Sequence, residues 1–218
     1  MAKKNNMQKM AQMKSYQQAR EQAEKEKTYK AKVKNLRLFP LLGLVMALVV
    51  LLLFFVSWSY IYNSDPTIGV EEKISGFNCF TAGISGNYSG TASVLGSMDI
   101  FNYYAGAYTV KIGTVTVVAF FLLLAEIAAF IVGAIKNKGL FSYVALALGA
   151  AVVALLFVCY SIGLSMKDAE ILSGFCQGNP KCSIRSEAIL PALLSLFSLV
   201  IPVVEIIRRA LLKKAYKG

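Results

Sequence analysis

The residue with the clearest capacity for chemistry is Glu126, a carboxylic acid inside an apolar run that covers residues 112–135. Ten residues separate it from Lys136. In a helix that rises about 1.5 Å per residue, Glu126 therefore lies about 15 Å from that charge, near the middle of a bilayer. Acids at this depth usually face a bundle interior or a water-filled cavity. Glu126 could contact an ion, a proton or a substrate there, or it could be a neutral carboxyl hydrogen-bonded to a neighbouring helix or a partner subunit.

A second acid in an apolar run, Glu205, has a different setting. Arg208 and Arg209 follow it at i+3 and i+4. This spacing predicts a salt bridge near the headgroups, with side chains that reach toward water. Glu126 is therefore the one buried charge on which a transport hypothesis would depend.

The rest of the sequence offers no catalytic arrangement. The chain has no histidine, which excludes His-dependent catalysis, His metal ligands and imidazole pH switches. It also has no Walker or Rossmann glycine loop, no serine elbow and no paired carboxylates on one helix. We therefore expect a protein that is not an enzyme, with no catalytic residues, no metal site and no cofactor.

Four long apolar runs must position these residues. Of the 218 residues, 56% are hydrophobic and 16% are charged, a balance that excludes a soluble enzyme and a disordered protein. At about 1.5 Å per residue each run reaches the roughly 30 Å of a hydrocarbon core. The sequence predicts an all-α membrane protein, a four-transmembrane-helix bundle with spans at about 38–62, 112–135, 139–166 and 188–207.

Basic residues predict the orientation of the bundle. Eighteen Lys and Arg fall on the side that holds residues 1–37, 136–138 and 208–218, and five fall on the opposite side. The positive-inside rule therefore predicts cytoplasmic N- and C-termini, with a basic arm at 1–37 and a basic tail at 208–218 around a transmembrane domain at 38–207. We expect an integral membrane protein of the plasma membrane, with the first span as an uncleaved signal anchor. Trp58, Tyr60 and Tyr62 are expected at the outer headgroups.

Two outer loops follow from this topology, at about 63–111 and 167–187. The first is rich in Gly, Ser, Thr and Tyr, and it has strand-like stretches at 67–74, 92–100 and 103–111 between turn signals such as Gly76, Gly83 and Gly86. We expect a small extracellular β-sheet from the first outer loop, packed over the helix ends. The alternative is an irregular glycine-rich loop.

The four cysteines all lie where an oxidising compartment can reach them. Cys176 and Cys182 flank a Gly-Asn-Pro turn at 178–180, which favours a disulfide between them and leaves Cys79 and Cys159 either paired or free. The alternative is a bond from Cys79 to a cysteine of the second loop. The spacing is a poor zinc pattern.

Small residues at i, i+4 spacing mark predicted helix contacts, since such faces let two backbones approach closely. We expect packing within the bundle, with a homo-oligomer contact as the alternative. The residues are Ala125, Ala129 and Gly133 on the second span, and Ala147 with Ala151 and Ala145 with Gly149 on the third.

The basic arm is predicted to be a polar helix or a disordered segment. Its last basic residues could each contribute about 1 kcal/mol on an anionic leaflet, or they could simply set the topology. Membrane lipids are therefore expected partners. Nucleic acid is not, because few aromatic residues are interleaved with the charges. The lipid-headgroup candidates are Lys27, Lys30, Lys32, Lys34 and Arg37.

Trp58 and the segment Gly76-Phe77-Asn78-Cys79 are similar to part of a first-loop motif, in which a Trp precedes Gly-Leu-Trp and two cysteines. With internal termini, a first outer loop of about fifty residues and a shorter second one, the layout over 38–207 resembles the claudin and peripheral myelin protein type of tetraspan membrane protein. The resemblance is one of topology, since loop one has no second cysteine. It implies a fold and not an activity.

Two functions are compatible with these features. The first is a non-enzymatic structural or accessory subunit that binds other membrane proteins, or copies of itself, through its outer loops and helix faces. The second is a channel or transporter subunit that uses the membrane-embedded Glu126. The lone acid and the missing internal repeats favour the first.

Overall fold

The fold comes from a computed structural model, which describes residues 2–63, 70–86, 98–167, 182–186 and 188–217. Four stretches are long and apolar enough to cross a membrane, as the sequence predicted: Met13–Phe55, Thr109–Lys136, Leu140–Ser165 and Ile189–Tyr216. The helices are α1 (Ala2–Asn35), α2 (Leu38–Leu52), η1 (Leu53–Phe55), α3 (Gly76–Ser85), α4 (Met98–Lys136), α5 (Leu140–Lys167) and α7 (Ile189–Lys217), and the strands are β1 (Ser57–Asn63), β2 (Val70–Ser75) and β3 (Cys182–Ser186).

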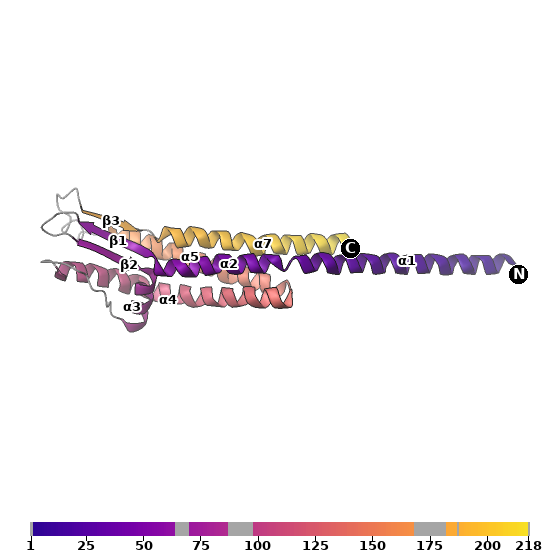
Figure 1. Cartoon of the computed structure of the whole chain (residues 1–218), viewed down its shortest axis with the longest axis horizontal. Helices are drawn as coiled ribbons and strands as arrows, with labels where there is room; N and C mark the ends of the chain where they lie inside the picture. The colour runs from indigo at the N-terminus through magenta and orange to yellow at the C-terminus, as the bar shows by residue number, and fades with distance from the viewer. Residues whose placement is uncertain (1, 64–69, 87–97, 168–181, 187, 218) are drawn as a thin grey trace.

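The four long helices form a bundle with two distinct ends (Figure 1). Helix α2 contacts α4 and α7, and α5 contacts the same two helices, so each member has two neighbours. The three-stranded sheet lies at one end, which we call the sheet end. The other, which we call the terminal end, carries the start of α2, the α4–α5 connection and the end of α7. From it α1 projects well beyond the bundle, nearly in line with α2.

The predicted first span is too long by about seven residues. Helix α2 ends at Leu52, one 3-10 turn follows, and β1 begins at Ser57. The stretch from Ser57 to Asn63 places an aromatic residue at every second position, Trp58, Tyr60 and Tyr62, which is the period of a strand and not of a helix. An apolar run does not distinguish the two, so the prediction of a helix to Tyr62 was wrong.

The predicted small sheet is present, but its strands come from three places. The order is β2-β1-β3, and both pairs are antiparallel. Tyr60 lies opposite Lys73 on one side and Arg185 on the other. The predicted strand at 67–74 corresponds to β2. The central strand comes from the predicted first span and the third from the second outer loop, so the sheet links the two loops and is not built from the first alone.

The other two predicted strands do not form in the described residues. Residues 103–111 belong to α4, which begins at Met98, and 92–97 lie outside the described part. Helix α3 packs against α4, where Gly83 lies close to Gly113, and a local sequence pattern cannot reveal such a partner. The prediction for 103–111 was wrong.

Helix α3 replaces part of the predicted glycine-rich loop. Ser75 and Asn78 form a capping box at its start, in which the Asn78 N–H donates to Ser75 Oγ over 3.1 Å and the Ser75 N–H donates to Asn78 Oδ1 over 3.2 Å. Gly86, with φ +70°, ends it in the left-handed conformation. The turn signal at Gly86 was therefore right, whereas Gly76 and Gly83 lie inside the helix.

Trp58 is buried among side chains of the protein, so its ring presents no surface to lipid headgroups, whereas its predicted depth in the membrane stays a prediction. It is 1% exposed, its indole N–H donates to the Leu53 carbonyl over 2.9 Å, and its ring centroid is 4.9 Å from that of Phe54. A Cβ on Gly76 would lie 2.4 Å from the ring. The indole therefore occupies the space that a side chain at residue 76 would need. Tyr60 and Tyr62 have no described side chains.

Replacing Gly76 with valine should push this indole out of its site. Trp58 is the sole tryptophan, so its fluorescence reports the event directly, and we expect a red-shifted emission maximum because the ring gains contact with water. Overpacking of this kind typically costs about 1–3 kcal/mol. The matched control is Gly133→Val. A Cβ at residue 133 would lie nearest to Phe141 Cβ, at 3.3 Å, and Trp58 is not among its neighbours. An unchanged emission maximum in Gly76→Val would contradict the packing described.

Candidate functional site: buried polar groups in the helix bundle

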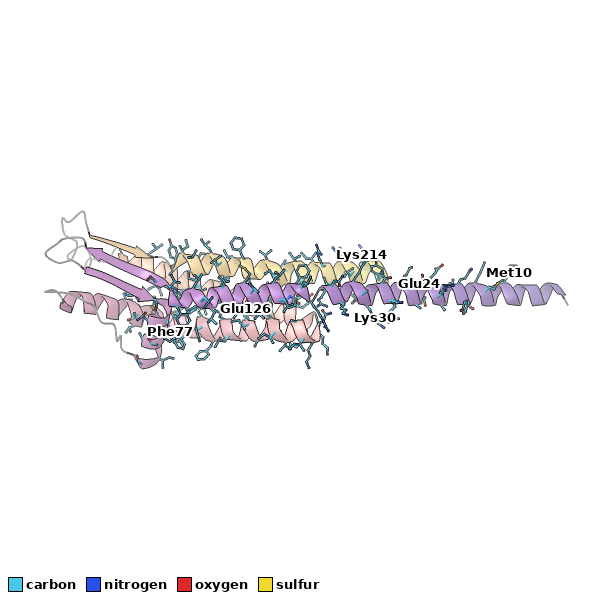
Figure 2. The ribbon with its side chains drawn as sticks, in the orientation of Figure 1. Met10, Glu24, Lys30, Phe77, Glu126 and Lys214 are labelled. Carbon is cyan, nitrogen blue, oxygen red and sulfur yellow. The ribbon has the colours of Figure 1, made fainter. Side chains whose placement is uncertain are left out.

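Glu126 lies inside the bundle formed by this single chain. It is 1% exposed, and it lies between the sheet end and the terminal end of the bundle (Figure 2). Ser198 Oγ on α7 lies 3.3 Å from Glu126 Oε1 and 2.7 Å from the Ser195 carbonyl oxygen, so its single hydroxyl proton is shared between the two acceptors. The carboxyl of α4 is thus hydrogen-bonded to α7.

A glycine on α5 provides the space for this carboxyl. A Cβ at Gly149 would lie 2.7 Å from Glu126 Oε1 and 2.7 Å from Leu199 Cδ2. Helices α4, α5 and α7 therefore meet around one acid, and the small size of residue 149 decides how closely they approach. In the described part of the chain, no ion pair includes Glu126. The arrangement can hold three helices together, and it can hold a proton on Oε1 or Oε2.

Glu126→Gln should leave the stability of the protein nearly unchanged. The amide oxygen can accept the same Ser198 hydrogen bond, and the substitution keeps the volume that Gly149 accommodates. We expect the thermal unfolding midpoint in mild detergent to stay close to that of the parent chain. The control Glu126→Leu removes the acceptor but keeps the volume, and Ser198 retains the Ser195 carbonyl. A large loss of stability in Glu126→Gln would contradict this hydrogen bond as the main role of the carboxyl.

A second buried polar cluster lies at the terminal end, and we call Asn137, Glu205 and Arg209 the terminal latch. Arg209 donates from Nε to Glu205 Oε1 over 2.8 Å, and its Nη2 lies 2.7 Å from the same oxygen as an ion pair. Nη2 also donates to Asn137 Oδ1 over 2.7 Å, and Nη1 to the Asn137 carbonyl over 3.3 Å. Asn137 Nδ2 donates to the Val33 carbonyl over 3.1 Å. The latch therefore joins α7, the α4–α5 connection and α1.

The predicted salt bridge of Glu205 has a different character from the one expected. Its partner is Arg209, and Glu205 is only 1% exposed, so the pair is buried instead of reaching toward water. The backbone of Asn137 is in the left-handed region at φ 49°, which Asn tolerates better than most residues. An Asn-Lys-Gly connection was thus a signal for a tight turn, but nothing in the sequence showed that Arg209 would close on it.

Two cysteines lie buried as free thiols near the sheet end, Cys79 on α3 and Cys159 on α5. The Cys159 sulfur is 3.7 Å from Thr116 Oγ1 on α4. Burial raises the pKa of the Cys79 thiol, and the neighbouring Cys159 thiol adds to the rise. A bond from Cys79 to the second loop, the alternative weighed above, does not form. Cys176 and the Cys182 side chain lie outside the described residues, so their disulfide stays a prediction.

The predicted small-residue contacts divide between the two sides of the helices. Ala129 and Gly133 are buried, as are Ala145 and Gly149, whereas Ala125 and Ala147 are exposed and Ala151 is half-buried. At about 100° per residue, Ala145 and Ala147 point to nearly opposite sides, so both cannot face inward. A spacing of four also drifts by about 40° per step, which turns Ala125 away from the interior. The prediction that Ala125 and Ala147 pack within the bundle was therefore wrong.

The headgroup candidates lie on the last turns of α1 and just beyond it. Lys27, Lys30, Lys32, Lys34 and Arg37 are all exposed. Lys30 pairs with Glu26 at 2.9 Å, and Lys32 Nζ donates to the Tyr216 hydroxyl over 2.7 Å. One of the five thus contacts the end of α7, a pairing across the whole chain that the sequence did not indicate.

Among the described residues, no three Cys, Asp or Glu side chains gather as a metal site would require. No protein-family model matches the chain, and neither a curated protein nor a solved structure shows significant similarity to it.

Proposed function

We propose that the protein is a non-enzymatic integral membrane protein that acts as a structural or accessory subunit and binds other membrane proteins. A chain with four apolar helices of sufficient length and eighteen basic residues on one side inserts with its terminal end in the cytoplasm and its sheet outside. The plasma membrane is the compartment that we assign.

The observation that carries the proposal is a face of α5 that no other described segment of the chain covers. We call it the α5 outer face. The small side chains of Ala147, Ala150, Ala154 and Ser161 lie on it at helical spacing, together with the larger Tyr143 and Val158, and all are exposed. The Ser161 hydroxyl donates to the Phe157 carbonyl of its own helix, so it presents no unsatisfied donor to lipid. Small outward residues let a second helix approach closely, and close packing drives association in membranes.

The alternative, a channel or transporter subunit, depends on Glu126. Its carboxyl is enclosed by α4, α5 and α7 and accepts a hydrogen bond from Ser198, which favours a role in packing over one at an oligomer axis. The two roles separate in reconstituted vesicles. Loss of ion flux in Glu126→Gln with normal expression would support transport, and the accessory role predicts no Glu126-dependent flux.

Photo-crosslinking in the membrane tests the accessory role. A photoreactive side chain at Ala150 should produce protein adducts, because a partner helix packs there. The matched control is position 118 on α4, which is also exposed but carries a larger side chain, Val118, and should give lipid adducts only. Adducts with a second copy of the chain would identify the partner as a homo-oligomer. Lipid adducts alone at position 150 would contradict the proposal.

A further inference from the structure

A cavity of about 580 Å³ lies at the terminal end, where the chain passes from α1 to α2 beside α7. We call it the basic groove. Its apolar walls include Leu38, Phe39 and Leu42 on one side and Leu211 on the other, and its two cations are Lys32 and Arg208. Its volume is in the range of sites that hold small organic molecules.

The two cations are positioned by aromatic rings. The Arg208 guanidinium lies 5.5 Å from the centre of the Phe39 ring, and Lys32 Nζ lies 5.1 Å from the centre of the Tyr216 ring while it donates to the Tyr216 hydroxyl. In the described part of the chain, neither cation has an ion-pair partner, and no acid lines the groove. Both keep N–H donors for an anion.

The apolar walls open toward the side of α2 that faces away from the bundle. Leu38, Leu42 and Leu211 are 63%, 55% and 61% exposed. The outward face of α2 continues with Leu41, Val45 and Val49, all exposed. The groove therefore joins a pair of cations to an apolar surface long enough for a hydrocarbon chain, at the point where the apolar part of the first span begins.

We propose that the basic groove binds one anionic glycerophospholipid from the leaflet that faces the terminal end. Its anionic headgroup lies on the side of the groove that carries Arg208, beside Phe39, and Lys32, beside Tyr216, and an acyl chain lies along Leu38 and Leu42. A water-soluble phosphate would contact only the cations, whereas a lipid contacts the cations with its headgroup and the apolar wall with its acyl chain. The site needs membrane insertion but no protein partner, so it is independent of the accessory role.

Native mass spectrometry of the full chain in mild detergent tests the site. We expect one phosphatidylglycerol to remain bound per chain, with phosphatidylcholine binding more weakly. Lys32→Gln and Arg208→Gln should each weaken phosphatidylglycerol binding several-fold, since each removes one positive charge from the lining of the groove. Both residues are exposed, so the variants should fold, and an unchanged thermal midpoint verifies this.

The matched control is Lys34→Gln, which removes the same charge from the same helix at an exposed position outside the groove. It should bind phosphatidylglycerol as the parent chain does. An equal loss in all three variants would show general attraction to the basic surface and overturn the proposal. Equal binding of phosphatidylcholine, no loss in either groove variant, or displacement of the lipid by millimolar inorganic phosphate would overturn it as well.

Discussion

Arg209→Gln is expected to lower the free energy of unfolding by about 3–5 kcal/mol, the typical loss when one partner of a buried ion pair is removed. Glu205 is 1% exposed and would remain as a buried carboxylate without its cation. The same change removes both donors to Asn137 and so loosens the α4–α5 connection. The shift of the thermal or SDS-induced unfolding midpoint in mild detergent measures the effect.

Two control variants test whether the effect of Arg209→Gln comes from the buried ion pair. Arg208→Gln removes the same charge from the next residue, which is exposed and, in the described part of the chain, forms no ion pair with Glu205, and it should change the midpoint little. The double variant Glu205→Gln with Arg209→Gln removes the stranded charge and should recover part of the stability. Equal midpoints for Arg208→Gln and Arg209→Gln would show that the terminal latch contributes nothing.

Gly113→Ala should be the second strongly destabilising change, although alanine normally favours a helix. A Cβ at residue 113 would lie 2.7 Å from the Gly83 Cα and 2.8 Å from its nitrogen. These are backbone atoms of α3, so the whole helix would have to shift. Overpacking costs about 1–3 kcal/mol, which exceeds the helix-propensity gain of up to about 1 kcal/mol.

The matched control is Gly133→Ala, the same substitution in the same helix. Its nearest neighbour, Phe141 Cβ at 3.3 Å, would have to move by only a few tenths of an ångström, so its unfolding midpoint should fall clearly less than that of Gly113→Ala. Limited proteolysis adds a local readout, because separation of α3 from α4 would expose the α3 backbone. A Gly113→Ala midpoint at or above that of Gly133→Ala would mean that α3 and α4 do not cross at these glycines.

The sequence predicted the features that depend on long apolar runs and on depth in the membrane. The second, third and fourth spans and the interior position of Glu126 belong to this class, since hydrocarbon thickness sets a length that residue counts can match. The end of the first span was wrong, because the stretch after Phe55 is apolar enough for a helix and alternates as a strand does.

Long-range contacts could not be predicted from the same residues. Strand β3 pairs with a strand more than a hundred residues earlier, and no local pattern specifies such pairing. Likewise, Gly149 beside Glu126 and Asn137 beside Arg209 are close only because the bundle folds. The direction of the small residues depends on which neighbour each helix faces, so Ala145 and Ala147 could not be distinguished by spacing alone.

The most direct test of the account is purification of the full chain in gentle detergent at native expression, with mass spectrometry of the co-migrating membrane proteins. We expect a partner at near-stoichiometric amounts that is lost in Ala150→Leu, which fills the α5 outer face, and retained in the control Val118→Leu. A chain that migrates alone as a monomer, or a partner equally abundant with both variants, would contradict the accessory role that we assign to this face.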